Sequence, residues 1–222
     1  MGVKVGPRII QNGLILDVDA AVSRSYSGTG LTANGLIGGI GGTLVNGVGF
    51  TSSNNGLFSF DGSNDYVQCT GSLTVTAATF VTWIRRNGNQ GQYDGILFSR
   101  GTNTTGMNFQ ASNQLGYHWN DAGNTYNWQS GLTIPNLTWC MIAVSVTSTA
   151  AIAYLCQTGG TTTATNTVNH SSSVLNDIKL ALDDAASRYF NGNIAIAQLY
   201  NTALSAADIS QNFEVDRARF GV

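Results

Sequence analysis

Short strand-like segments recur along almost the whole chain, and turn-forming dipeptides separate them. Residues 80–84, for example, place Phe, Val, Thr, Trp and Ile in succession, alternating large apolar residues with smaller ones. Asp-Gly or Asn-Gly pairs follow such segments at 61–62, 87–88, 94–95 and 191–192. These pairs readily adopt the positive φ that a tight hairpin turn needs. Many short strands with dense turn signals are typical of an antiparallel sandwich or jelly roll.

Composition argues against a helical fold. Glu214 is the only glutamate, and Lys4 and Lys179 are the only lysines, so two strong helix formers are almost missing. Charged residues make up 10% of the chain, against about 25% in an average soluble domain. A length of 222 residues fits one large all-β domain. We therefore expect an all-β fold, a two-sheet antiparallel jelly-roll sandwich.

One short helix is expected near the C-terminus. Ser205 with Asp208 three residues later resembles a capping box, in which the two side chains bond each other's backbone. Ile209 and Phe213 would then lie on one face of the helix. We expect about two or three turns that pack against the rim of the sandwich in a structural role.

The charge pattern and the length of the apolar stretches exclude two classes of partner, nucleic acids and membranes. Net charge is −2 at pH 7, and no basic block is larger than the pair Arg85-Arg86, so we expect no nucleic-acid binding. The longest apolar stretches, such as 141–146, have the length of a strand, so we expect no membrane insertion. Residues 1–12 lack the apolar core of a signal peptide, so we expect no secretory leader.

The three cysteines have no metal-ligand spacing and are expected to be buried free thiols.

Four longer segments resemble, in chain order, the motifs of laminin G-like domains in the concanavalin A-like lectin/glucanase superfamily. Residues 58–67 resemble the hairpin with an Asp-Gly turn, and 79–84 resemble the strand with a central tryptophan. Residues 136–143 and 190–205 resemble two later strands, the second of which ends in Leu-Ser. The resemblance covers most of the chain. It implies a concanavalin A-like jelly roll over residues 13–222, preceded by an N-terminal arm, residues 1–12.

The two ends of this domain carry a narrower resemblance. Residues 13–30 and 211–222 are similar to the opening and the close of laminin G-like proteins encoded in tailed-phage genomes. That resemblance implies a non-enzymatic virion structural protein, made in the host cytoplasm and located in the virion. A lone module without fibre repeats favours a capsid decoration or cement role. The implied partners are the major capsid protein or other virion proteins, with assembly as a homo-oligomer.

The N-terminal arm is the segment expected to take part in assembly. Its apolar residues, Val3, Val5, Ile9 and Ile10, lie on either side of Pro7. An arm of this kind can drape over a neighbouring subunit, or it can be the frayed start of a strand. We favour the first interpretation.

The glucanases of the superfamily use a pair of glutamates on one strand, and this chain lacks such a pair. Retaining hydrolysis needs two carboxylates about 5–5.5 Å apart across the scissile bond. Glu214 stands alone in the expected helix, and the adjacent Asp183 and Asp184 would point to opposite sides of a strand. His118 and His170 have no serine or cysteine nucleophile motif around them. We therefore expect no enzymatic activity.

Calcium is the one candidate cofactor, and none is required. Laminin G-like members often hold Ca²⁺ in loops at the sandwich rim, and Asp183 and Asp184 fall at about the position of such ligands. Asn103 would complete the set, because oxygen ligands in turns suit Ca²⁺. The alternative is that these side chains form Asx turns with their own backbone.

A carbohydrate-binding adhesin module, of a tail fibre or a surface protein, is the alternative function. Its glycan site would use aromatic faces beside polar side chains. Two pairs of aromatic residues, 117 with 119 and 126 with 128, are each two positions apart and so share a strand face. That spacing favours packing in the core or between subunits over glycan binding. The residues that would bind the glycan are Trp119, Asp121, Asn124, Tyr126 and Trp128.

Overall fold

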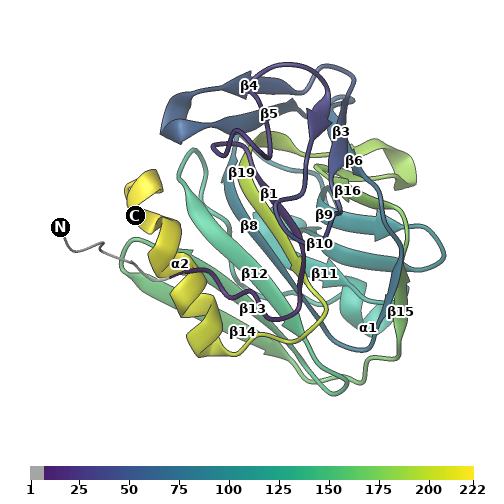
Figure 1. Ribbon diagram of the computed structural model, residues 1–222. Coiled ribbons are helices and arrows are strands. Elements are labelled where there is room, and N and C mark those ends of the chain that lie inside the picture. Colours follow the sequence, from purple (N-terminus) through teal and green to yellow (C-terminus); the bar gives the residue numbers. More distant parts are fainter. Residues whose placement is uncertain (1–7) are drawn as a thin grey trace.

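The computed structural model describes residues 8–222 and contains two antiparallel sheets that pack face to face (Figure 1). The 8-stranded sheet has the order β14-β13-β12-β8-β19-β5-β4, with β1 also paired to β19. Its strands are β1 (Leu14–Asp19), β4 (Gly49–Thr51), β5 (Leu57–Asp61), β8 (Ala78–Arg86), β12 (Cys140–Val146), β13 (Ala151–Gln157), β14 (Gly160–Asn166) and β19 (Asn191–Tyr200). The expected all-β jelly-roll sandwich is confirmed.

The 7-stranded sheet has the order β11-β10-β9-β16-β6-β3-β2. Its strands are β2 (Thr32–Ala33), β3 (Gly42–Val45), β6 (Tyr66–Cys69), β9 (Gly95–Arg100), β10 (Thr104–Gln110), β11 (Gln114–His118) and β16 (Ile178–Leu180). Two small ribbons complete the strands: β7 (Leu73–Val75) with β15 (Ser173–Leu175), and β17 (Leu182–Asp183) with β18 (Arg188–Tyr189). The remaining elements are α1 (Gly123–Tyr126), α2 (Ala206–Phe220) and the 3₁₀ turns η1 (Ser53–Asn55), η2 (Ala111–Asn113) and η3 (Ala185–Ser187).

The main core lies between the two sheets, and strand periodicity determines which residues enter it. On β8, Phe80 and Ile84 belong to this core, whereas Val81 and Trp83 belong to a second apolar cluster on the outer face of the 8-stranded sheet. Successive side chains of a strand point to opposite faces. A strand that is apolar on both faces must therefore be covered on both sides.

Helix α2 provides the outer cover (Figure 1). Ser205 and Asp208 form the expected capping box. Phe213 and Phe220 stack on Trp83, with ring centroids 5.5 and 4.2 Å away. The helix has 15 residues, about four turns. The expected short C-terminal helix is confirmed, but it is longer than the two or three turns expected and covers the outer face of the sheet instead of the rim, because that face is apolar.

The described part of the predicted arm packs on its own domain. Ile9 and Ile10 lie against the apolar cluster under α2, and the Ile10 amide donates a hydrogen bond to Asn212 Oδ1 at 2.8 Å. Gln211 Nε2 donates to the carbonyl oxygen of Arg8 at 2.7 Å. Ile9 and Ile10 thus pack on their own domain, and a contact of the arm with a neighbouring subunit stays a prediction. Val3 and Val5 lie outside the described residues.

Two other expectations bear on the class of protein. Cys69, Cys140 and Cys156 are buried free thiols, as expected. Burial raises the pKa of the Cys69 thiol to about 12, so it stays protonated at neutral pH. In residues 8–222 no helix combines the length and the apolar character that crossing a membrane requires.

Candidate functional site

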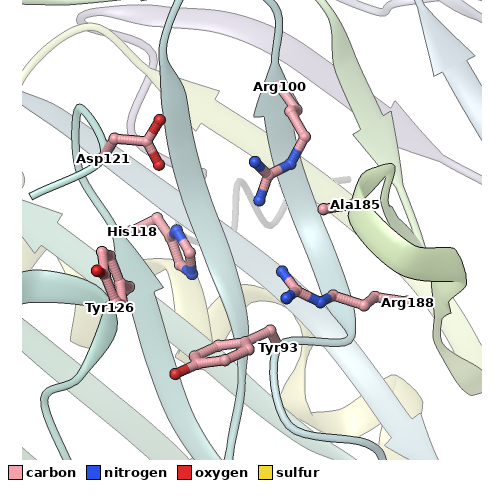
Figure 2. Close-up of a pocket in the computed structure, with 7 residues that line it drawn as sticks. All are labelled: Tyr93, Arg100, His118, Asp121, Tyr126, Ala185 and Arg188. Carbon is pink, nitrogen blue, oxygen red and sulfur yellow. The ribbon is translucent and has the colours of Figure 1, made fainter. Parts of the chain in front are cut away.

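A pocket of about 370 Å³ opens at the β11 end of the 7-stranded sheet. Side chains from well-separated parts of the chain meet there, including the ends of β9 and β11, helix α1 and the turn from η3 to β18. Figure 2 shows two arginines on one side, with an aspartate, a histidine and a tyrosine across from them. The lining residues are Tyr93, Arg100, His118, Asp121, Tyr126, Ala185 and Arg188.

Strand alternation places His118 on the outer face of the sheet. Leu115 and Tyr117 of β11 point into the main core, so His118 points away from it. Its neighbour across the ladder is Gly106 of β10, which adds no side chain beside the imidazole. A Cβ at Gly106 would lie 2.5 Å from the carbonyl oxygen of Leu97, so a larger residue does not fit there.

Aromatic rings enclose the His118 imidazole. Tyr126 stacks on it with the ring centroids 5.2 Å apart, and Tyr93 and Phe98 meet it edge-on at 5.6 and 5.1 Å. The residue is 4% exposed, and neither ring nitrogen has a hydrogen-bond partner among the described residues. Burial lowers the pKa of His118 to about 4, so the ring is neutral at physiological pH.

Asp183 pairs with Arg100 and Arg188, the two arginines across the pocket from His118 (Figure 2). Its carboxylate is fully buried and accepts hydrogen bonds from Arg100 Nε, from Arg100 Nη2 at 3.0 Å and from Arg188 Nη1 at 2.8 Å. Burial alone would raise the pKa of Asp183, but the hydrogen bonds from Arg100 and Arg188 outweigh burial and lower that pKa. A Cβ on Gly95 would lie 2.3 Å from the Asp183 amide, so glycine at this position lets β17 come close to β9.

Several polar groups at the pocket remain free to bind a ligand. Arg188 bonds Asp183 through Nη1 only, and its guanidinium lies over the Tyr93 ring with 4.7 Å to the centroid. Asp121 is exposed at the opening, and its carboxylate makes no hydrogen bond within the described residues. The pocket therefore combines N–H donors, a carboxylate acceptor, a neutral imidazole and two tyrosine rings.

The structure brings two of the five predicted glycan residues into this pocket. Asp121 and Tyr126 line it, whereas Trp119 is 1% exposed in the main core and its indole N–H donates to the carbonyl oxygen of Ser171 at 2.6 Å. Trp128 packs against the core and meets Tyr117 edge-on. Asn124 is exposed on α1 but does not line the pocket.

The prediction that Tyr126 and Trp128 share a strand face was wrong. Residues 123–126 form the one-turn helix α1, which turns Tyr126 over His118. The sequence interpretation also missed Tyr93, Arg100, His118 and Arg188 as binding residues. Alternation was the one available signal, since it predicts that His118 faces away from Tyr117.

Each of the predicted calcium ligands has its own partner within the protein. Asn103 Oδ1 accepts from the Val174 amide at 2.8 Å, and the Asp184 carboxylate pairs with Lys179 Nζ at 2.5 Å. Asp183 is bound by two arginines. Among residues 8–222 no group of three His, Cys, Asp or Glu side chains is placed to hold a metal ion. The structure therefore does not support the predicted ligand set of Asn103, Asp183 and Asp184.

Comparison with solved structures finds many similar folds at low sequence identity. Domain 4 of AbnA, a GH43 extracellular arabinanase from Geobacillus stearothermophilus, in complex with arabinotriose, has a TM-score of 0.69 and 14% identity. The match covers 90% of this chain and 97% of that domain. The binding domain of Paraclostridial Mosquitocidal Protein 1 has a TM-score of 0.64 and 10% identity, over 93% of this chain and 52% of that one.

Trypanosoma rangeli sialidase in complex with sialic acid matches 99% of this chain, with a TM-score of 0.66 and 11% identity, but only 35% of the sialidase chain. These likenesses show the shared sandwich fold. No curated protein sequence matches this chain. The family model described as concanavalin A-like lectin/glucanases superfamily, of the laminin G type, matches residues 61–210. With more than half of its length matched, this chain belongs to the concanavalin A-like lectin/glucanases superfamily.

Proposed function

We propose that this protein is a non-catalytic carbohydrate-binding domain and that the pocket of Tyr93, His118, Asp121, Tyr126 and Arg188 is its binding site. One observation carries the proposal: a hollow on a lectin-type sandwich combines tyrosine rings with hydrogen-bonding groups that have no partner among residues 8–222. Small-molecule sites are concave and largely apolar, with a few convergent polar groups that orient the ligand. A sugar presents both C–H faces and hydroxyl groups, so it matches this combination.

The similar structures support a binding role. The arabinanase domain is described as holding arabinotriose, and the mosquitocidal protein fragment is described as a binding domain. For this chain, a carbohydrate-binding role is proposed because its own pocket offers groups that suit a sugar.

The carboxylates of this chain support a role without hydrolysis. Glu214 is exposed on α2, which covers the other sheet, and it pairs with Arg217 at 3.1 Å. At the pocket, the buried Asp183 carboxylate is bound by two arginines, which leaves Asp121 as the exposed carboxylate of the lining. Glycoside hydrolysis in most families requires two carboxyl groups that act on one bond.

A glycan array tests the proposal. The full chain is applied to printed glycans, followed by two pocket variants, Tyr126→Ala and Asp121→Asn. Asparagine tolerates the positive φ of 58° at position 121, so the second variant keeps its fold and loses only the charge. Thr162→Ala, on the exposed edge strand β14, is the matched control. We expect binding that both pocket variants weaken and the control retains.

Two results would contradict the proposal. The first is an array on which no glycan binds the native chain. The second is binding that Tyr126→Ala and Asp121→Asn leave unchanged, which would place the glycan site elsewhere on the surface.

The capsid decoration role stays a prediction, supported by the resemblance of the two ends of the domain to phage-encoded laminin G-like proteins. It is compatible with glycan binding, because a virion surface protein can also bind host glycans. Cryo-electron microscopy of the particle tests it. Density for this chain on the capsid lattice is the expected result, and a particle without the chain would contradict it.

A further inference from the structure

We infer that the ligand of this pocket is a neutral sugar and that a hydroxyl group of this sugar is read by His118. The inference rests on the proposed carbohydrate-binding function and specifies its ligand class. It follows from three features: the charge balance of the pocket, the hydrogen-bonding capacity of the imidazole, and the position of Tyr126.

The pocket has no excess of positive charge. Among the lining residues and Asp183, two positive charges from Arg100 and Arg188 meet two negative charges from Asp183 and Asp121. Burial raises the pKa of Asp94, near Arg188, to about 6, so at neutral pH it adds a further negative charge. An acidic sugar therefore gains no net attraction here and meets the exposed carboxylate of Asp121.

The hydrogen bonds of Arg100 also favour a neutral ligand. Carboxylates are recognised best by the fork of two parallel N–H groups of one guanidinium. On Arg100 this fork, Nε with Nη2, is already occupied by Asp183. Arg188 donates to the same carboxylate through Nη1 only. Its remaining N–H groups form the one guanidinium fork at the pocket that Asp183 does not occupy, and these groups can donate to hydroxyl oxygens as well.

His118 selects for a hydroxyl over a carboxylate. A neutral imidazole has one N–H donor and one nitrogen acceptor. A hydroxyl can bond either nitrogen, because it both donates and accepts, whereas a carboxylate can only accept. Both nitrogens are buried and have no partner among the described residues, and leaving buried polar atoms unpaired is unfavourable. A hydroxyl delivered to this position therefore relieves that cost and gains affinity.

Tyr126 controls access to His118. Its ring stacks on the imidazole, and it belongs to α1, which has only four residues. The ring is partly exposed, and its hydroxyl has no hydrogen-bond partner among residues 8–222. We expect the ring to swing aside when the ligand enters, so that the hydroxyl reaches His118 and the tyrosine face covers the sugar.

Matched pairs of glycans test the ligand class. The full chain is titrated with lactose and 3′-sialyllactose, with the methyl ester of trigalacturonic acid and the free acid, and with arabinotriose. We expect neutral members to bind more tightly than their acidic counterparts. Tighter binding of the acidic members would overturn this inference and leave the carbohydrate-binding function intact. If no member binds, and no other glycan binds on the array, the proposed function fails as well.

His118→Phe tests the role of the histidine, because it keeps an aromatic ring and removes both nitrogens. We expect the affinity for the neutral ligand to fall at least about fivefold, the loss of one typical hydrogen bond. The midpoint of thermal unfolding should stay equal or rise, since two unpaired buried nitrogens disappear. A merely structural histidine would not produce these opposite effects.

Asn108→Leu is the control for this experiment. Asn108 lies on the same outer sheet face and also has buried, unpaired polar atoms, but it does not line the pocket. The control should retain wild-type affinity. Wild-type affinity in His118→Phe, or a lower unfolding midpoint in parallel with weaker binding, would overturn the role of His118.

Discussion

Replacing Asp183 by asparagine tests whether its carboxylate holds Arg100 and Arg188 in place at the pocket. The carboxylate is fully buried and accepts three hydrogen bonds from Arg100 and Arg188 and one from the amide of Ala185 at 3.2 Å. Asparagine keeps the shape of the side chain but leaves both guanidinium groups without a counter-charge and turns an N–H₂ group toward one of them.

The expected loss of stability follows from burial. Removing one partner of a fully buried ion pair costs about 3–5 kcal/mol. The two arginine side chains remain 26% and 25% exposed, so water screens part of their charge and the lower end applies. We therefore expect Asp183→Asn to lower the free energy of unfolding by about 3 kcal/mol. For a domain of this size, that loss corresponds to a decrease in Tm of about 6–12 °C.

Urea denaturation and thermal unfolding of both forms measure this effect, and the neighbouring residue supplies the control. Asp184 is exposed and pairs with Lys179, so Asp184→Asn should cost less than about 1 kcal/mol. The reasoning is refuted if Asp183→Asn loses no more stability than Asp184→Asn. A further check is the triple variant Asp183→Leu, Arg100→Met, Arg188→Met. It should recover much of the loss, because no unpaired charge remains.

Two further predictions concern the side of the molecule under α2. Burial raises the pKa of Asp17 to about 6, with the negative charge of Asp19 adding to the shift and a hydrogen bond from Gln198 opposing it. Because this pKa is higher in the folded state than in the unfolded state, the stability that protonated Asp17 contributes should be fully present below about pH 4 and be lost as pH rises through about 6. Asp17→Asn should reduce the loss of stability between pH 4 and pH 6 in urea titrations and add up to about 3 kcal/mol at pH 7.5, while the shares of Asp94 and Asp216 remain; an unchanged pH profile would contradict the assignment. Phe220→Ala should cost about 3 kcal/mol, because the ring stacks on Trp83 within the outer cluster. Tryptophan fluorescence during urea unfolding measures that loss, and an unchanged midpoint would show that α2 contributes little.

Much of the fold could be predicted from the sequence, since strands and turns depend on local preferences. The predicted strand 80–84 lies within β8, and the Asp61-Gly62 turn follows β5, with a φ of 76° at the glycine. The helix also begins where the capping box predicts. Its length and position were not predicted, because they depend on the apolar outer face of the 8-stranded sheet, to which Trp83 contributes.

The candidate site shows the same division between local and tertiary information. The sequence by itself determined that His118 faces away from the core, because alternation along a strand is a local property. Only the tertiary structure decided that Arg100 and Arg188 share one buried carboxylate, and that Tyr126 covers the imidazole. These residues come from segments far apart in the chain. Their meeting depends on strand order and on the turns that carry Tyr126 and Arg188, which no local preference specifies.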